Sequence, residues 1–148
     1  MSTYENGSLL EILLVEDNPG DITLTKEAFD DAKIRNNLTV VQTGSEVIPY
    51  LKQEGEYSNS TRPDLILLDL NLPRKSGLEI LKDIRADEKL KRIPVVVLTT
   101  SEAEKDVLGA YDLNANSYVT KPVDLDKFIE VIKSIEGFWL TFVKYPKE

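Results

Sequence analysis

The feature that most constrains the fold is the stretch PDLILLDLNLP at residues 63–73. Its apolar centre, residues 65–68, lies between two prolines, and a short apolar run of this kind is typical of a strand buried on both faces. Proline removes a backbone donor, so we expect the strand to end before Pro73. Asp69 then lies where a buried strand emerges into a loop. Ligands of open α/β sheets bind just outside such strand ends, although an aspartate there also suits a simple turn.

Strand and helix patterns alternate along the rest of the chain. Apolar runs predict strands at residues 9–15, 38–42, 65–68, 94–98 and 117–120. Amphipathic stretches predict helices after each strand, with these N-terminal capping residues: Asn18, Ser45, Ser76, Ser101 and Asp124. This order implies parallel strands joined by right-handed crossovers. We therefore expect an α/β fold, a doubly wound (βα)5 flavodoxin-like three-layer sandwich whose five-stranded parallel sheet has the order 2-1-3-4-5.

The composition excludes several classes of function. The chain has 148 residues, long enough for one domain with a substantial core, and contains neither cysteine nor histidine. Disulfides, thiol chemistry, Ser/His triads and His/Cys zinc sites are therefore excluded, and any metal must be held by oxygen ligands, as Mg²⁺, Ca²⁺ and Mn²⁺ are.

The charge and the apolar runs also bear on partners and location. The net charge of −8 disfavours direct binding to nucleic acid or to anionic membranes. The sequence shows no signal peptide and no apolar run long enough to insert into a bilayer. We therefore expect a cytoplasmic protein.

Polar residues follow four of the predicted strands. In chain order they are Glu16 and Asp17, then Asp69 and Asn71, then Thr99, then Lys121. In the predicted strand order these four strands are neighbours, so their carboxyl ends meet in one cleft. Each residue alone has a plainer explanation: acids suit a first helical turn, asparagine suits a turn, threonine can simply end a strand, and lysine is common on surfaces. Their joint occurrence favours a functional site.

The chemistry of that set points to phosphoryl transfer. Three carboxylates in one cleft repel one another unless a proton or a cation is bound. Mg²⁺ binds a few carboxylates and also accepts phosphate oxygens. A lysine and a threonine hydroxyl add a positive charge and a donor for a phosphoryl group in transfer. Asp69 can then act as the nucleophile and form an aspartyl-phosphate.

Four motifs give the chain a strong resemblance to the receiver domain of two-component response regulators. They are LVED at residues 14–17, LLDLNLP at 67–73, LTT at 98–100 and YVTKP at 118–122. The resemblance covers residues 9–136. It leaves residues 1–8 as a polar N-terminal tail and residues 137–148 as an aromatic-rich extension.

The resemblance implies a phosphoacceptor and a metal site. Asp69 is similar to the family's phosphoacceptor. Asp17, Asp69 and the backbone carbonyl of Asn71 are similar to its Mg²⁺ ligands, with Glu16 acting through water. The oxygen ligands also allow Mn²⁺.

The family resemblance also implies which residues change conformation on phosphorylation. Thr99 resembles the hydroxyl that turns toward the phosphoryl group, Tyr118 the aromatic residue coupled to it, and Lys121 the lysine bonded to the phosphate. The bond between Lys121 and Pro122 is expected to be cis. Phosphorylation is then expected to shift the face formed by the fourth helix, the fifth strand and the last helix, which changes partner binding or dimerisation.

A narrower resemblance concerns residues 53–57, 62–63, 90–94 and 138–140, which are similar to small stand-alone response regulators of phytochrome-type sensor kinases. The implied partner is a sensor histidine kinase, with the phytochrome type as the candidate. The implied protein is a signalling protein and not an enzyme with a separate substrate, since it catalyses only its own phosphotransfer and autodephosphorylation.

Aromatic and apolar residues are concentrated near the C-terminus: Phe138, Trp139, Leu140 and Phe142. A soluble acidic protein does not normally expose such a surface. The segment either packs on the last helix of its own chain or contributes to a homodimer. The family resemblance favours the homodimer.

Three other functions are compatible with parts of the pattern. A haloacid-dehalogenase-type phosphatase also uses a strand-end aspartate with Mg²⁺, but needs a second aspartate where this chain has Asn71. A flavin or nucleotide carrier needs a phosphate-binding loop after the first strand. In this chain Glu16 and Asp17 follow that strand, and their negative charges would repel the phosphate. A receiver that binds partners without phosphorylation would not need a complete phosphoryl site. This chain has every residue of that site, which favours the phosphorylated form.

Overall fold

The fold is known from a computed structural model that describes residues 9–31, 35–99 and 117–120, together with four residues beyond them: Asp124, Asp126, Lys127 and Glu130. Its strands are β1 (Leu10–Val15), β2 (Asn36–Val41), β3 (Leu65–Asp69), β4 (Val95–Thr99) and β5 (Ser117–Thr120). Its helices are α1 (Pro19–Asp31), α2 (Val47–Leu51) and α3 (Gly77–Ala86), and two short 3₁₀ helices are η1 (Gly44–Glu46) and η2 (Gly55–Tyr57). The helix predicted after residue 101 lies outside the described residues.

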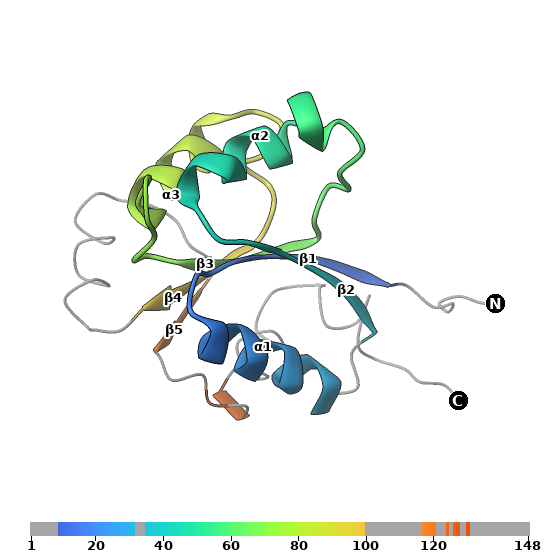
Figure 1. Cartoon of the computed structure of the whole chain (residues 1–148), viewed down its shortest axis with the longest axis vertical. Helices are drawn as coiled ribbons and strands as arrows, with labels where there is room; N and C mark the ends of the chain where they lie inside the picture. Colours follow the sequence, from blue (N-terminus) through green and yellow to red (C-terminus); the bar gives the residue numbers. More distant parts are fainter. Residues whose placement is uncertain are drawn as a thin grey trace.

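The five strands form one parallel sheet in the order β2-β1-β3-β4-β5, which confirms the predicted topology. Figure 1 shows α2 and α3 on one face of the sheet and α1 on the other, as expected for a three-layer doubly wound fold. β2 begins at Asn36, two residues before the predicted start. It pairs with β1 along the whole length of both strands, and the side-chain nitrogen Nδ2 of Asn37 donates to Glu11 Oε1 at 3.1 Å.

The sheet separates two apolar cores, because successive side chains of a strand point to opposite faces. On the α2 and α3 side, Leu13 and Val15 of β1 pack with Leu68 of β3 and with the helices. On the α1 side, Leu14 and the neighbouring strand residues pack against Phe29. Every residue of β3 is buried, which confirms the interpretation of residues 65–68 as a doubly buried strand.

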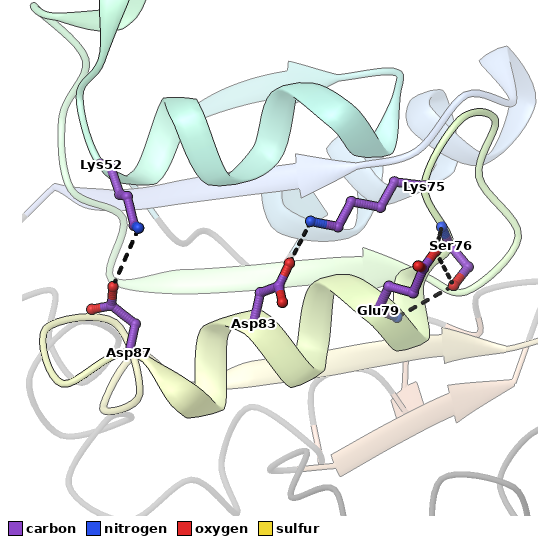
Figure 2. A network of polar contacts seen from close by, with 6 residues as sticks. All are labelled: Lys52, Lys75, Ser76, Glu79, Asp83 and Asp87. Atoms are coloured by element: carbon purple, nitrogen blue, oxygen red, sulfur yellow. Dashed lines mark hydrogen bonds and ion pairs between the residues drawn. The ribbon is translucent and has the colours of Figure 1, made fainter.

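The helix ends are fixed by the predicted caps. The Asn18 carboxamide oxygen accepts the Asp21 amide at 3.0 Å at the start of α1. Ser76 and Glu79 form a reciprocal capping box at the start of α3, drawn in Figure 2. The Lys127 amide donates to Asp124 Oδ1 at 3.0 Å, so Asp124 also caps as predicted.

The prediction that Ser45 caps the second helix is wrong. Ser45 lies inside η1, and the chain turns before it, at Thr43. The Gly44 amide already donates to the Pro73 carbonyl at 3.1 Å, which fixes the turn one residue before Ser45. Pro49 lies inside the five-residue helix α2, near its start, where a missing amide donor is tolerated.

Glu46 anchors the corner between β2 and α2. Its carboxylate accepts the Thr43 hydroxyl at 2.6 Å and the Tyr57 hydroxyl on its other oxygen. The hydrogen bonds from Thr43 and Tyr57, helped by the positive charge of Arg74, lower the pKa of Glu46 below its usual value. The same carboxylate raises the pKa of Tyr57 to about 12. The Tyr57 ring also packs edge-on against Tyr50, at 5.6 Å between centroids.

No helix in the part of the chain that the structure describes has the length and apolar character needed to cross a membrane.

The lowered pKa of Glu46 and the raised pKa of Tyr57 predict how the substitution Tyr57→Phe changes stability with pH. A carboxyl with a lowered folded pKa stabilises the fold above its unfolded value of 4.5, and this is lost as the pH falls through the folded pKa. A phenol with a raised pKa stabilises the fold below its unfolded value of 10.0, and this is lost as the pH rises toward about 12. The stability difference between wild type and Tyr57→Phe should therefore be largest between about pH 5 and 9, in urea unfolding across the pH range.

Tyr50→Phe is the matched control, since it removes a hydroxyl from the neighbouring ring and leaves Glu46 untouched. A difference between wild type and Tyr57→Phe that stays constant from pH 4 to 11 would contradict the role assigned to the Glu46–Tyr57 hydrogen bond.

Candidate functional site

The register of the sheet brings the acidic strand ends together. Val15 of β1 pairs with Leu68 of β3, so the next residues, Glu16 and Asp69, lie side by side at the carboxyl edge of the sheet. The Glu16 amide donates to the Val41 carbonyl of β2 at 3.0 Å, which continues the strand pairing as far as Glu16. The sequence-predicted convergence of strand ends is thus confirmed for β1 and β3.

Three carboxylates meet at this edge. Glu16, Asp17 and Asp69 each offer an oxygen, and these oxygens all lie within 4.8 Å of one another. Glu16 and Asp69 are buried, with 0% and 2% of their surface exposed, whereas Asp17 is exposed to solvent. Burial weakens the screening of like charges by water, so a cation that binds between the carboxylates relieves a strong repulsion. An all-oxygen ligand set with one face open to water fits Mg²⁺ or Mn²⁺.

Backbone amides orient two of the carboxylates. The Asn18 amide donates to Glu16 Oε2 at 3.2 Å, and the Asn71 amide donates to Asp69 Oδ1 at 3.1 Å. These hydrogen bonds fix the direction of both side chains at the strand ends, which prepares the carboxylates for a ligand.

Gly77, at the start of α3, lets the helix approach the end of β3 closely. A Cβ atom on Gly77 would lie 2.5 Å from the Asp69 carbonyl oxygen and 2.7 Å from Leu70 Cα. The Gly77 amide instead donates to the Leu70 carbonyl at 3.1 Å. Sequence reasoning assigned Gly77 no role, because a single glycine after a capping serine carries no signal of a tertiary contact.

The remaining predicted site residues are described only in part. Thr99 ends β4 and pairs with Thr120 of β5, and Tyr118 lies within β5, so the backbone of Thr99 lies on the strand next to β3 and that of Tyr118 lies one strand further out. Their side chains lie outside the described residues. So do Lys121 and Pro122, the cis bond predicted between them, and the aromatic extension with Phe138, Trp139, Leu140 and Phe142.

Comparison with known families identifies the class of protein. Residues 12–133 match the model of the response regulator receiver domain. The chain belongs to this family and is a signalling protein of two-component systems, whose receiver domains are typically phosphorylated on an aspartate with Mg²⁺ bound. This membership does not favour the phosphatase alternative.

Individual relatives narrow the class. The chain is 47% identical to response regulator Rcp1 of Synechocystis sp. over 91% of its own length and 92% of the relative's. It is also similar to the solved structure of the phosphorylated cyanobacterial phytochrome response regulator RcpA, at 50% identity and TM-score 0.75, covering 90% of this chain and 96% of that one. The bacteriophytochrome response regulator RtBRR gives TM-score 0.82 at 42% identity, with coverages of 89% and 81%. The chain therefore resembles phytochrome-associated response regulators in both sequence and fold.

The carboxylate cluster predicts an unusual effect of Asp69→Asn on stability. In metal-free buffer the substitution removes one of three repelling charges and keeps an oxygen that can accept the Asn71 amide, so it should stabilise the fold by on the order of 1 kcal/mol. Added Mg²⁺ should stabilise the wild type through preferential binding to the folded state, and the variant much less. Urea unfolding with a chelator and with Mg²⁺ measures both effects.

Glu27→Gln is the control, because Glu27 is exposed on α1 and outside the cluster. Equal stabilisation of wild type and Asp69→Asn by Mg²⁺ would show that the three carboxylates do not form the metal site.

Proposed function

We propose that this chain is a cytoplasmic response regulator that accepts a phosphoryl group from a sensor histidine kinase onto Asp69. The observation that carries the proposal is the set of three carboxylate oxygens, from Glu16, Asp17 and Asp69, within 4.8 Å of one another at the carboxyl edge of a receiver sheet. Asp69 is the nucleophile because it ends a strand that is buried along its whole length and its side chain is already oriented by the Asn71 amide.

The metal of the proposed site is Mg²⁺, with Mn²⁺ as a substitute. Asp17, Asp69 and the carbonyl of Asn71 would be its ligands, and Glu16 would act through water. Bound there, the ion supplies positive charge that offsets the carboxylates and the incoming phosphoryl group. The solved structure of Rcp1 in its Mn²⁺-bound form supports this assignment, at 46% identity to this chain and TM-score 0.74 over 93% of this chain and 99% of that one.

The proposed transfer is a displacement at phosphorus. A carboxylate oxygen of Asp69 forms a bond to the phosphorus of the kinase phosphohistidine. The phosphorus–nitrogen bond breaks with its electron pair going to the ring nitrogen, and this nitrogen takes a proton from solvent as the imidazole leaves. The product is an aspartyl-phosphate. In autodephosphorylation, water attacks the phosphorus, inorganic phosphate leaves, and the Asp69 carboxylate is restored. The chain would thus catalyse only its own phosphotransfer and its own dephosphorylation.

The proposed switch uses residues of β4, β5 and the segment after β5. The phosphoryl group adds negative charge and three acceptor oxygens. The Thr99 hydroxyl and the Lys121 ammonium would bind it, Tyr118 would follow Thr99, and a cis bond before Pro122 would direct Lys121 to the cleft. Positions of Thr99 and Tyr118 at the β4–β5 pair support this arrangement.

The kinase is proposed to be of the phytochrome type, supported by the similarity to RcpA and RtBRR. The receiver domain is proposed to comprise residues 9–136, between a polar tail and an aromatic extension. With a net charge of −8, the receiver is proposed to act on protein partners and not by binding nucleic acid directly.

Incubation with acetyl phosphate and Mg²⁺ tests the phosphoacceptor. Intact-mass measurement should show one phosphoryl group on the wild type and none on Asp69→Asn, because the amide cannot act as the nucleophile. A chelator should suppress the adduct, and hydroxylamine should release it as expected for an acyl phosphate. Asp64→Asn is the matched control at the opposite end of β3 and should be phosphorylated like the wild type. An adduct that persists in Asp69→Asn would overturn the assignment.

The aromatic extension is proposed to form a homodimer. Phe138, Trp139, Leu140 and Phe142 would supply the apolar contact that a dimer requires. Sedimentation equilibrium should show a dimer for the wild type and a weaker association for Trp139→Ala, since large aromatic residues often dominate such interfaces. Association that is unchanged in Trp139→Ala would argue that the extension packs on its own domain.

A further inference from the structure

Gly44 makes a backbone contact that joins two separate loops. It is buried at the start of η1, three residues after the end of β2, and its amide donates to the Pro73 carbonyl at 3.1 Å. A Cβ atom at this position would lie 1.9 Å from the carbonyl oxygen of Lys75 and 2.7 Å from its carbonyl carbon. Both are backbone atoms, so a side chain at position 44 could be accommodated only if the loop between β3 and α3 moved.

That loop contains a strained turn. The Lys75 amide donates to the Pro73 carbonyl at 2.9 Å, and Arg74 between them has a φ of 74°. A hydrogen bond from residue i+2 back to residue i, around a residue of positive φ, is the arrangement of a γ-turn, which is rare and strained. Strain of this kind persists only where the surroundings hold it. The Pro73 carbonyl also accepts a hydrogen bond from the Gly44 amide, and this second bond stabilises the strained turn.

The two ends of the loop are fixed by other contacts. The Leu70 amide donates to the Leu98 carbonyl of β4 at 3.2 Å, and Gly77 closes the loop on Leu70. On the α3 side, Lys75 forms an ion pair with Asp83, and the Ser76–Glu79 capping box lies next to it (Figure 2). The Pro73–Lys75 turn is therefore held between α3 and Gly44.

The turn lies two residues from Asn71, whose amide holds the Asp69 carboxylate and whose carbonyl is a proposed metal ligand. A Cβ on Gly44 would lie 1.9 Å from the Lys75 carbonyl oxygen, so this oxygen would have to move by about 1 Å to reach the shortest distance that Cβ contacts allow. Metal ligands tolerate displacements of only about 0.2 Å, so a shift of the turn that reaches Asn71 even in small part would disturb the site.

We propose that Gly44 is a positioning residue for the metal and phosphoryl site: its amide and its lack of a side chain hold the Pro73–Lys75 turn, and through it Asn71. The inference rests on the proposed function. Hydrogen bonds from Thr43 and Tyr57 to Glu46 fix the short helix η1 that begins with Gly44, which supports the inference.

Gly44→Ala and Gly55→Ala form a matched pair for the test. Gly55 has a φ of 55°, so alanine there strains the backbone, but a Cβ on it meets no atom within 4 Å. Both variants should lose stability, and only Gly44→Ala should disturb the site. Calorimetric titration with Mg²⁺ should show a dissociation constant weakened by about 10–100-fold in Gly44→Ala, the usual range for residues that orient metal ligands, and unchanged within about twofold in Gly55→Ala.

Phosphorylation by acetyl phosphate separates positioning from simple loss of folded protein. For Gly44→Ala the initial rate should be low at sub-saturating Mg²⁺ and recover in part at saturating Mg²⁺. A variant that is only less stable would instead lose rate by the same factor at every Mg²⁺ concentration. Folded Gly44→Ala with the wild-type Mg²⁺ affinity would overturn the inference.

A second pair keeps the test decisive if Gly44→Ala does not fold. Arg74 is exposed, so Arg74→Val and Arg74→Gly should both fold. Valine strongly disfavours positive φ, whereas glycine adopts it freely. Mg²⁺ should therefore bind more weakly to Arg74→Val than to Arg74→Gly, and equal affinities would count against a role of the turn in metal binding.

A wild-type protein that binds no Mg²⁺ overturns the proposed function together with this inference. Normal wild-type binding with no difference within either pair overturns this inference alone.

Discussion

Repulsion among Glu16, Asp17 and Asp69 is the constraint on which the rest of the structure depends. Two of these carboxylates are buried, where like charges are poorly screened. Nothing in a flexible chain would keep them together, so the sheet must do so. The parallel pairing of β1 with β3, and the apolar cores on the two faces of the sheet, make the sheet rigid enough to hold the three carboxylates together. The fold thus accepts a local electrostatic cost at one edge, and the buried apolar surface offsets it.

Most of the fold follows from periodicity. The doubly buried strands, the alternation of strands with helices and the strand order were all predictable, because continuous apolar runs occur mainly in parallel sheets covered on both faces. β5 has the predicted bounds, and the caps at Asn18, Ser76 and Asp124 were recognisable from local side-chain chemistry. The acidic cluster was predictable for a related reason: once strand order is known, the residues that follow adjacent strands must lie together.

The features that sequence reasoning missed depend on contacts between distant segments. Ser45 has the residue type of a helix cap, but the Gly44 amide is bonded to Pro73, and the turn is set before Ser45 is reached. Gly44 and Gly77 look like ordinary loop and helix-start glycines. Their importance lies in backbones that approach too closely for a Cβ atom, and no local pattern encodes the distance to another loop. The early start of β2 has the same origin, because pairing along the full length of β1 determines it.

The parallel register also determines when, during folding, the acidic site comes into existence. Glu16 and Asp69 belong to strands that are far apart along the chain and become neighbours only through a crossover connection. Non-local pairings of this kind pay their loop-closure entropy before they gain contact energy, so they tend to form late. A partly folded chain would expose Asp69 without its acidic neighbours, Glu16 and Asp17. Competence to receive a phosphoryl group is then tied to completion of the fold, and an immature chain stays silent in the signalling pathway.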